Sequence, residues 1–480
     1  MDQPSVSAGS PPSRPPAGPL ADVRVLDLSR VLAGPWATQA LADLGATVWK
    51  VERPGAGDDT RGWGPPFLSD GSGDACYFAA ANRNKLALAI DFTHPEGAAL
   101  IRALARHADL VVENFRTGTL ARHGLDLADL RRANPRLVTC SITGFGQTGP
   151  RAREAGYDFL IQGMGGLMAI TGEPGGGPLR AGIPVADLAT GLYAGISMLA
   201  ALHHARATGQ GQHIDAGLLQ AQVAMLANHW ASWLNAGVAP GRSGNAHATV
   251  VPYRDFPTSD GTLIIAVGSD RQFRALADVL GRPDLAADSR YATNAGRQQA
   301  RAALEAEIAA ETAKRTRADL LAALADAGVP AGPINALPDV FADPQVAATG
   351  LVATVAREDG TVLRLVGYPQ TLSATPATVR SAPPRLGQHT REVLHDVLGL
   401  GDAELDRLEA AGAIAPARPP VDIRKVDIRT NAGDPPPGPR PDEGEPACRR
   451  EDDRAPRNCH GEPAIPPAPC GSSCVSPRSG

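Results

Sequence analysis

Residues 23–54 read VRVLDLSRVLAGPWATQALADLGATVWKVERP, with an amphipathic segment between two apolar runs. The first run (23–29) predicts a buried strand, and the last run (46–54) predicts a second one. The segment between them (35–45) predicts a helix that tolerates a proline in its first turn. A strand, a helix and a second strand in this order form a βαβ unit, which requires a parallel sheet with helices on its faces.

Strand-like and helix-like segments keep alternating after this unit. Residues 85–92 (KLALAIDF), 109–115 (DLVVENF) and 137–146 (LVTCSITGFG) read as strands, and residues 95–108 and 127–134 read as helices between them. The fold class is therefore predicted to be α/β, with a Rossmann-like open parallel sheet. In sheets of this type, ligands gather at the carboxyl ends of the strands.

The later residues predict a second, smaller domain. Residues 250–268 read as a hairpin with Asp260 and Gly261 at its turn, and helical segments follow up to Gly328. Residues 329–346 contain several prolines and are expected to form an irregular connector. The predicted divisions of the 480-residue chain are a disordered extension (1–19), a large Rossmann-like domain (20–230), a small α+β domain (231–330), a return segment completing the large domain (331–415) and a disordered tail (416–480).

Composition narrows the classes of function. The formal net charge of −5, without a block of Lys or Arg, argues against a nucleic-acid surface. The first residues lack a secretory signal pattern, and the apolar stretches are interrupted before the roughly 18 residues that span a membrane, so a cytoplasmic protein is expected. Four of the six cysteines lie in the predicted tail with spacing unlike a zinc site, so no metal is expected. They are Cys448, Cys459, Cys470 and Cys474.

Charged residues follow the first predicted strands. Arg30 and Arg53 lie after strand ends, where a basic pair could hold phosphate, and Arg122 is a third candidate, although each could equally be a solvated surface residue. Glu52 stands where dinucleotide-binding folds have an acid that binds ribose. However, the first turn reads SRVLAGP and lacks the G-x-G-x-x-G fingerprint, so dinucleotide binding is kept only as an alternative.

Asp187 interrupts the small and apolar run AGIPVADLATG (181–191), just before an apolar helical segment. Because it follows a predicted strand end, its carboxylate could be the N-cap of the helix. The same position near helical N–H groups would also keep a carboxylate ionised and nucleophilic. Local sequence leaves both roles open.

Eight blocks in order, from Leu20 to Ile414, resemble the class III coenzyme A transferases, which include formyl-CoA transferase, the carnitine CoA-transferase group and the α-methylacyl-CoA racemases. The resemblance implies an acyl-CoA:carboxylate CoA-transferase with a coenzyme A thioester as co-substrate and no tightly bound cofactor. It also implies an interlocked homodimer, in which each chain threads through a ring formed by the other. The blocks include RVLDLSRVLAGPWATQALADLGATVWKVERPGAGDDTRGWG, NRNKLALAIDF, VVENFRTGTLARHGL, YDFLIQGMGG, ADLATGLYAG and LGQHTREVL.

By this resemblance Asp187 is the nucleophile that forms an aspartyl-CoA thioester. The racemases of the family are similar to this chain but have a histidine where it has Tyr157. A tyrosine with an ordinary pKa of about 10 is a poor acid or base near neutral pH, so CoA transfer is preferred. A racemase or epimerase remains an alternative, as does a non-catalytic protein that binds CoA or a dinucleotide.

The resemblance also implies substrate contacts. Formyl or oxalyl transfer is not expected, because Leu32 replaces the glutamine of formyl-CoA transferase and its tetraglycine loop is not recognisable. The chain looks most like the succinyl-CoA:glutarate branch, whose dicarboxylates need a cation or donor at the far end. The acyl-group candidates are Trp63, His247 and Arg254, with His247 equally readable as a hairpin-edge residue. The CoA-binding candidates are Arg30, Leu32, Ala33, Arg53, Phe92, Thr93, Asn114, Phe115, Arg122 and Tyr157.

Overall fold

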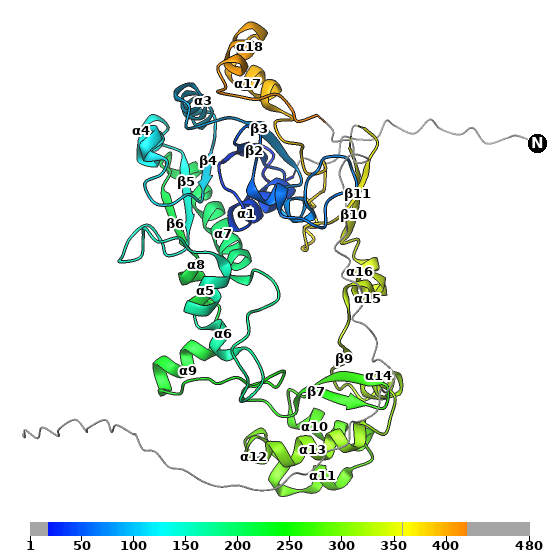
Figure 1. The fold of residues 1–480 in the computed structure, drawn as a ribbon. Helices are drawn as coiled ribbons and strands as arrows, with labels where there is room; N and C mark the ends of the chain where they lie inside the picture. Colours follow the sequence, from blue (N-terminus) through cyan, green and yellow to red (C-terminus); the bar gives the residue numbers. More distant parts are fainter. Residues whose placement is uncertain (1–17, 358, 420–480) are drawn as a thin grey trace, which may run out of the picture. The chain divides into compact units, whose positions relative to one another are not determined.

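A computed structural model describes residues 18–357 and 359–419 (Figure 1). The four cysteines of the predicted tail, nearly all of that tail and most of the N-terminal extension lie outside the described residues. Six parallel strands form the main sheet in the order β3-β2-β1-β4-β5-β6. They are β1 (Arg24–Asp27), β2 (Thr47–Glu52), β3 (Lys85–Ala89), β4 (Leu110–Glu113), β5 (Val138–Thr143) and β6 (His213–Gly217).

This strand order confirms the predicted Rossmann-like α/β fold. The order is that of doubly wound sheets, in which the chain reverses direction of travel between β1 and β4 and leaves a crevice at their carboxyl ends. Val25 of the central strand pairs with Val48 on one side and with Leu110 on the other. Strands in this position are buried on both faces, which explains their nearly continuous apolar sequence.

Each face of the sheet has its own hydrophobic core. Because successive strand residues point to opposite faces, Val25 packs in one core and Leu26 in the other. Leu26 shares its core with Leu394 and Leu405, so the end of the described chain packs beside the first strand. Helices α1 (Ala33–Asp43), α7 (Val185–Thr208) and α8 (Leu218–Ala224) line one core, and α3 (Pro95–Arg106), α4 (Leu127–Ala133), α17 (Thr390–Leu398) and α18 (Asp402–Ala410) line the other.

A separate core lies between Val251 and Val329. The predicted hairpin is present as β7 (Tyr253–Thr258) and β8 (Gly261–Ala266), with Ser259 and Asp260 at the turn. The helices that follow are α10 (Asp270–Val279), α11 (Pro283–Ala287), α12 (Asn294–Gln299), α13 (Arg301–Thr312) and α14 (Arg317–Asp326).

The prediction of an irregular connector over 329–346 is wrong. This segment holds β9 (Ala331–Pro333), which pairs antiparallel with β8, and then α15 (Leu337–Ala342) and α16 (Pro344–Ala348). Both helices have proline in the first turn, where its missing N–H costs no hydrogen bond. Two of the four prolines that suggested a loop, Pro338 and Pro344, therefore begin helices.

The remaining elements are short, apart from α9. The strands β10 (Val352–Ala356) and β11 (Val362–Val366) form an antiparallel hairpin. The others are η1 (Asp59–Gly62), α2 (Cys76–Ala79), η2 (Ala121–His123), α5 (Asp158–Met164), α6 (Leu167–Ile170), α9 (Asn228–Ala236) and η3 (Ser289–Tyr291).

Helix α7 has 24 residues and a mean hydropathy of 1.5 over its most apolar window, although the apolar stretches were expected to stop short of a membrane span. Among the residues described, it alone is long and apolar enough to cross a membrane by those two criteria. However, 44% of that window is buried within the protein, and Met198 and Leu202 pack in the core beneath the sheet. A core helix of an α/β domain meets the same criteria.

Candidate active site

The loops that follow β1 and β4 are tied together where the sheet order reverses. The backbone N–H of Arg30 donates to Oδ1 of Asn114 at 2.8 Å, and Nδ2 of Asn114 donates to the carbonyl oxygen of Arg30 at 2.7 Å. Since these bonds satisfy both backbone groups of Arg30, they fix its position at the crevice. Asn114, predicted as a CoA contact, therefore holds the loop that carries another predicted contact.

A cavity of about 410 Å³ opens beside these loops. The structure brings together around it Arg30, Arg53, Phe92, Thr93 and Phe115, all predicted CoA contacts. The guanidinium of Arg30 lies 5.1 Å from the centre of the Phe115 ring, and the Phe92 and Phe115 rings meet edge to face at 5.1 Å. Aromatic rings beside a guanidinium suit a ligand that has both a flat base and phosphate groups.

Two arginines at this cavity share one carboxylate. Arg30 and Arg53 pair with different oxygens of Asp59, at 3.1 and 2.9 Å. Because two guanidinium groups meet one carboxylate, donors remain available on them, and Nε of Arg30 has no hydrogen-bond partner among the described residues. An incoming phosphate can therefore bind here without displacing every existing partner.

The remaining predicted CoA contacts lie elsewhere. Leu32 and Ala33 are buried at the start of α1, so they offer backbone rather than side-chain contacts. Arg122 is exposed in η2, does not line the cavity, and donates from Nη2 to Thr119 Oγ1 at 3.3 Å. Its neighbour His123 packs edge to face against Phe92, with ring centres 5.6 Å apart.

The loop after β1 is held in an unfavourable conformation by buried charges. Val31 has a φ of +68°, which is costly for a β-branched residue. Its N–H donates to both oxygens of Asp58, each at 3.2 Å. The fully buried Lys50 donates to Asp58 at 2.9 Å and to the carbonyl oxygen of Ser29 at 3.1 Å. These contacts compensate the strain and fix the loop from below.

Of the two roles that the local sequence left open for Asp187, the structure rules out the N-cap, because Asp187 lies inside the first turn of α7. The N-cap position belongs to Pro184, whose side chain accepts no hydrogen bond. The cap comes instead from Asp158 of α5, whose Oδ1 accepts from the N–H groups of Ala186 at 2.8 Å and of Asp187 at 3.4 Å. This leaves the Asp187 carboxylate free of the capping role.

The surroundings of Asp187 make its ionisation unusual. Burial, together with the nearby charge of Asp158, raises the pKa of Asp187 to about 7. A carboxyl with this pKa exchanges between its protonated and ionised forms near neutral pH. Buried acids with such a pKa are typical of catalytic sites.

Close packing brings the start of α7 to the loop after β1. Gly191 lies one turn beyond Asp187, and a Cβ there would be 2.7 Å from the carbonyl oxygen of Ala33. Only glycine permits this approach without a shift of the backbone. The same turn of α7 therefore lies against the first residues of α1, next to the loop of the CoA candidates.

An aromatic pair lies beside the acid. Trp63, a predicted acyl contact, packs edge to face on Tyr77 with ring centres 5.3 Å apart. Burial, together with the nearby charges of Asp187 and Asp158, raises the pKa of Tyr77 to about 12. This phenol therefore lies near enough to both carboxylates for their charges to act on it. Tyr157 begins α5 directly before Asp158 and is 68% exposed.

Sequence reasoning missed Asp158 and Tyr77. Both affect Asp187 through space although they are distant from it in the sequence, and neither has a characteristic sequence spacing to Asp187. The one available signal was that Asp158 lies in a block resembling the family, YDFLIQGMGG, whereas Tyr77 lies between two such blocks.

The other two acyl candidates have local partners. The Nδ1 atom of His247 accepts from the N–H groups of Thr249 and Val250, both at 3.1 Å, which organises that loop. Arg254 on β7 pairs with Glu305 at 3.2 Å. A role for either in binding the acyl group stays a prediction.

Glu52, the acid considered for ribose binding, is committed elsewhere. It is buried, and both of its oxygens accept from Arg61 at 2.7 Å. A carboxylate neutralised in this way is a poor ribose ligand, which weighs against the dinucleotide alternative. Arg61 also pairs with Asp74 at 2.6 Å, so these groups form a buried network under the site.

Comparison with known proteins agrees with this arrangement. The chain is 50% identical over 401 residues to a succinate–glutarate CoA-transferase of Agrobacterium fabrum, covering 83% of this chain and 98% of that one. It is 42% identical to the succinyl-CoA:glutarate CoA-transferase of Mus musculus, covering 82% and 90%. A solved CAIB/BAIF family protein from Brucella suis matches with a TM-score of 0.72 and 46% identity, over 79% of this chain and 100% of that one. The model of CoA-transferase family III matches residues 20–390, and this chain belongs to that family.

Proposed function

We propose that this protein transfers CoA from succinyl-CoA to a small carboxylic acid, most favourably a dicarboxylic acid, with Asp187 as the nucleophile. The observation that carries the proposal is the partly buried Asp187 at the start of α7, relieved of capping by Asp158 and titrating at about pH 7. The names of the related transferases support the choice of succinyl-CoA as donor.

The reaction proceeds through covalent steps on the Asp187 carboxylate. The carboxylate attacks the thioester carbonyl of succinyl-CoA, releases CoA thiolate and forms a mixed anhydride. The thiolate then attacks the aspartyl carbonyl, which releases succinate and leaves an aspartyl-CoA thioester. The acceptor carboxylate attacks this thioester and releases the thiolate again. In the last step the thiolate attacks the acceptor acyl carbonyl, which forms the new acyl-CoA and restores Asp187.

Other residues bind CoA and exclude water from the reacting groups. The cavity of Arg30, Arg53 and Phe115 binds the nucleotide part of CoA through phosphate and ring contacts. Trp63 and Tyr77 form an apolar wall that keeps water from the anhydride and thioester, because hydrolysis would lose the activated acyl group. Both forms of Asp187 are accessible near neutral pH, and the ionised one reacts.

A homodimer, interlocked as in the family, is part of the proposal, as are the domain divisions and a cytoplasmic location. In support of the dimer, α7 leaves a row of large apolar side chains uncovered in the single chain, each 37% to 65% exposed. A second copy would remove this surface from water. The row consists of Leu192, Tyr193, Ile196 and Leu199.

The deciding experiment incubates the purified full chain with succinyl-CoA and a panel of mono- and dicarboxylic acids in deuterated water. We expect a new acyl-CoA with the mass of the acceptor, glutarate among the best acceptors, and no deuterium at the α-carbon. Exchange at the α-carbon without an acceptor would instead indicate a racemase, for which Tyr157 is poorly suited. Binding of CoA with neither transfer nor exchange would support a non-catalytic binding protein.

The pH profile tests the role of Asp158. Because only ionised Asp187 is nucleophilic, turnover should rise with pH and reach half its plateau near the pKa of about 7. Asp158→Asn removes a negative charge but keeps an oxygen for the N–H of Ala186. The pKa of Asp187 should therefore fall, and the midpoint should move to lower pH by roughly half to one unit.

The measurement is kcat against pH for the two proteins. Asp343→Asn makes the same substitution at the cap of α16, where Asp343 accepts from the N–H of Gln345 at 2.7 Å, and its profile should match wild type. A midpoint in Asp158→Asn that stays in place or moves to higher pH would contradict the assigned charge effect.

A further inference from the structure

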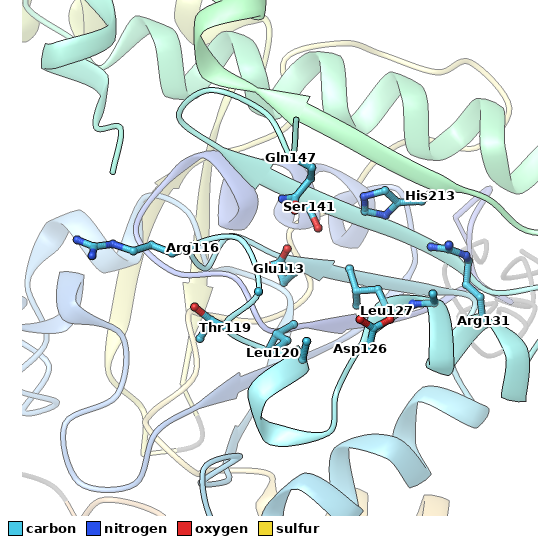
Figure 2. Close-up of a pocket in the computed structure, with 13 residues that line it drawn as sticks. Glu113, Arg116, Thr119, Leu120, Asp126, Leu127, Arg131, Ser141, Gln147 and His213 are labelled. Atoms are coloured by element: carbon cyan, nitrogen blue, oxygen red, sulfur yellow. Dashed lines mark hydrogen bonds between the residues drawn. The ribbon is translucent and has the colours of Figure 1, made fainter. Parts of the chain in front are cut away.

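A second cavity, of about 210 Å³, lies between α4 and the sheet (Figure 2). It is lined from β4, the loop after β4, α4, β5 and β6, and none of its lining residues was predicted as a substrate contact. Pockets for drug-sized ligands are typically 300 Å³ or larger, so a space of this size suits a molecule of a few heavy atoms.

The floor of this cavity is polar because β5 and β6 alternate strictly. In β5, Val138 and Cys140 pack in the core with α1 and α7, while Thr139 and Ser141 point to the opposite face. Ser141 lies beside Glu113 of β4, and Thr139 lies beside His213 of β6. Parallel strands covered by helices are normally apolar on both faces. A polar floor therefore requires either internal partners or a ligand.

Two hydrogen-bond donors at this floor lack full partners. Arg131 on α4 donates from Nη1 to Thr139 Oγ1 at 2.7 Å, and no carboxylate in the described chain lies within ion-pair distance of it. The Nε2 atom of Gln147 is buried and has no hydrogen-bond partner among the described residues. A buried amide donor without an acceptor costs about 1 to 3 kcal/mol, which an oxygen ligand would recover.

Each acidic group near the cavity already accepts a hydrogen bond from the backbone. Burial raises the pKa of Glu113 to about 7, so its carboxyl carries less than a full charge near neutral pH. Asp126 is occupied as the N-cap of α4, where it accepts from the N–H of Ala128 at 2.8 Å. Asp215 accepts from the backbone N–H of Gln147 at 2.8 Å. Figure 2 shows Glu113 and Ser141 side by side, with the Arg131 guanidinium near His213.

We propose that this cavity is a second, non-catalytic site for a small carboxylate anion, whose oxygens accept from the Arg131 guanidinium and from the Gln147 amide. The planar guanidinium fork matches the two oxygens of a carboxylate. This binding does not depend on the proposed function of the protein.

The site has a short physical connection to the CoA cavity. Glu113 on its floor accepts from the N–H of Phe115 at 2.7 Å, and Phe115 lines the CoA cavity against Arg30. A bound anion that changes the position or charge of Glu113 therefore acts directly on that ring. Through this contact, the concentration of free carboxylate would adjust the KM for acyl-CoA. This effect on KM, unlike the binding itself, rests on the proposed function.

The test is equilibrium dialysis of the full chain with radiolabelled succinate and no CoA compound. We expect Arg131→Gln and Gln147→Leu each to weaken binding about tenfold or more, since each removes a donor to the anion. Arg132→Gln is the matched control, because the adjacent Arg132 side chain is 74% exposed and pairs with Asp129, and it should bind as wild type does. Gln147→Leu breaks no ion pair, so it remains informative if Arg131→Gln fails to fold.

Equal succinate binding by all four proteins, or no saturable binding by wild type, would overturn the proposal. Displacement of succinate by inorganic phosphate at lower concentration would also overturn it, since the site would then be one for phosphate. CoA transfer is measured in parallel on the same preparations. Loss of transfer with retained succinate binding concerns the proposed function only, and the reverse result concerns this site only.

Discussion

Replacing Asp187 by asparagine is expected to lower kcat for CoA transfer by about four orders of magnitude or more. The amide keeps the size of the side chain and the first turn of α7, but it cannot attack the thioester as a carboxylate does. Losses of this size are typical when an enzyme loses its nucleophile. Binding of CoA should change little, because the cavity of Arg30 and Phe115 is formed by other loops.

Trapping of the covalent intermediate makes this prediction specific. Wild-type protein treated with succinyl-CoA and then with hydroxylamine or borohydride should carry a modification at Asp187, found by mass spectrometry of peptides. Asp187→Asn should carry none. Rapid transfer by Asp187→Asn, or a trapped adduct on another residue, would remove Asp187 from the mechanism even if transfer itself is confirmed.

Replacing Lys50 by methionine is expected to lower the free energy of unfolding by roughly 3 to 5 kcal/mol. Lys50 is fully buried and pairs with Asp58, whose pKa stays at about 2 because the charge and hydrogen bond of Lys50 outweigh the effect of burial. Methionine fills similar space but leaves the Asp58 charge buried without its cation. The measurement is equilibrium unfolding in urea at pH 7.

Two comparisons isolate the buried charge. Lys314→Met makes the same substitution at a side chain that is 64% exposed and paired with Glu311, and it should change stability by less than about 1 kcal/mol. Adding Asp58→Asn to Lys50→Met should recover part of the loss, since the unpaired charge is then removed. If Lys50→Met unfolds at the urea concentration of wild type, the buried pair contributes nothing to stability.

The main sheet could be predicted from sequence because its signals are local. Each strand is a short apolar run, each helix has its own periodicity, and the alternation of the two leaves few possible topologies. The same logic located Arg30 and Arg53 at strand ends, the family resemblance added Phe115, and these residues do meet around one cavity.

The features that the sequence did not predict depend on contacts between residues distant in the chain. Asp187 was considered as the cap of α7 because an acid before a helix is the usual cap, whereas the cap comes from Asp158, 28 residues before the Ala186 N–H that it accepts from. The connector over 329–346 was misjudged because proline marks both loops and first helical turns, and because β9 becomes a strand only through its pairing with β8. Neither distinction is present in the local sequence.

The cap that Asp158 of α5 provides to α7 also affects when activity appears during folding. A helix that supplies its own cap can form early, with its terminal groups already oriented. Helix α7 receives its cap from α5, so the nucleophile is oriented only once two separate segments have docked. A compact intermediate with native helix content but loose packing would therefore have no catalytic activity. Recovery of activity on refolding should lag behind recovery of the far-ultraviolet dichroism signal.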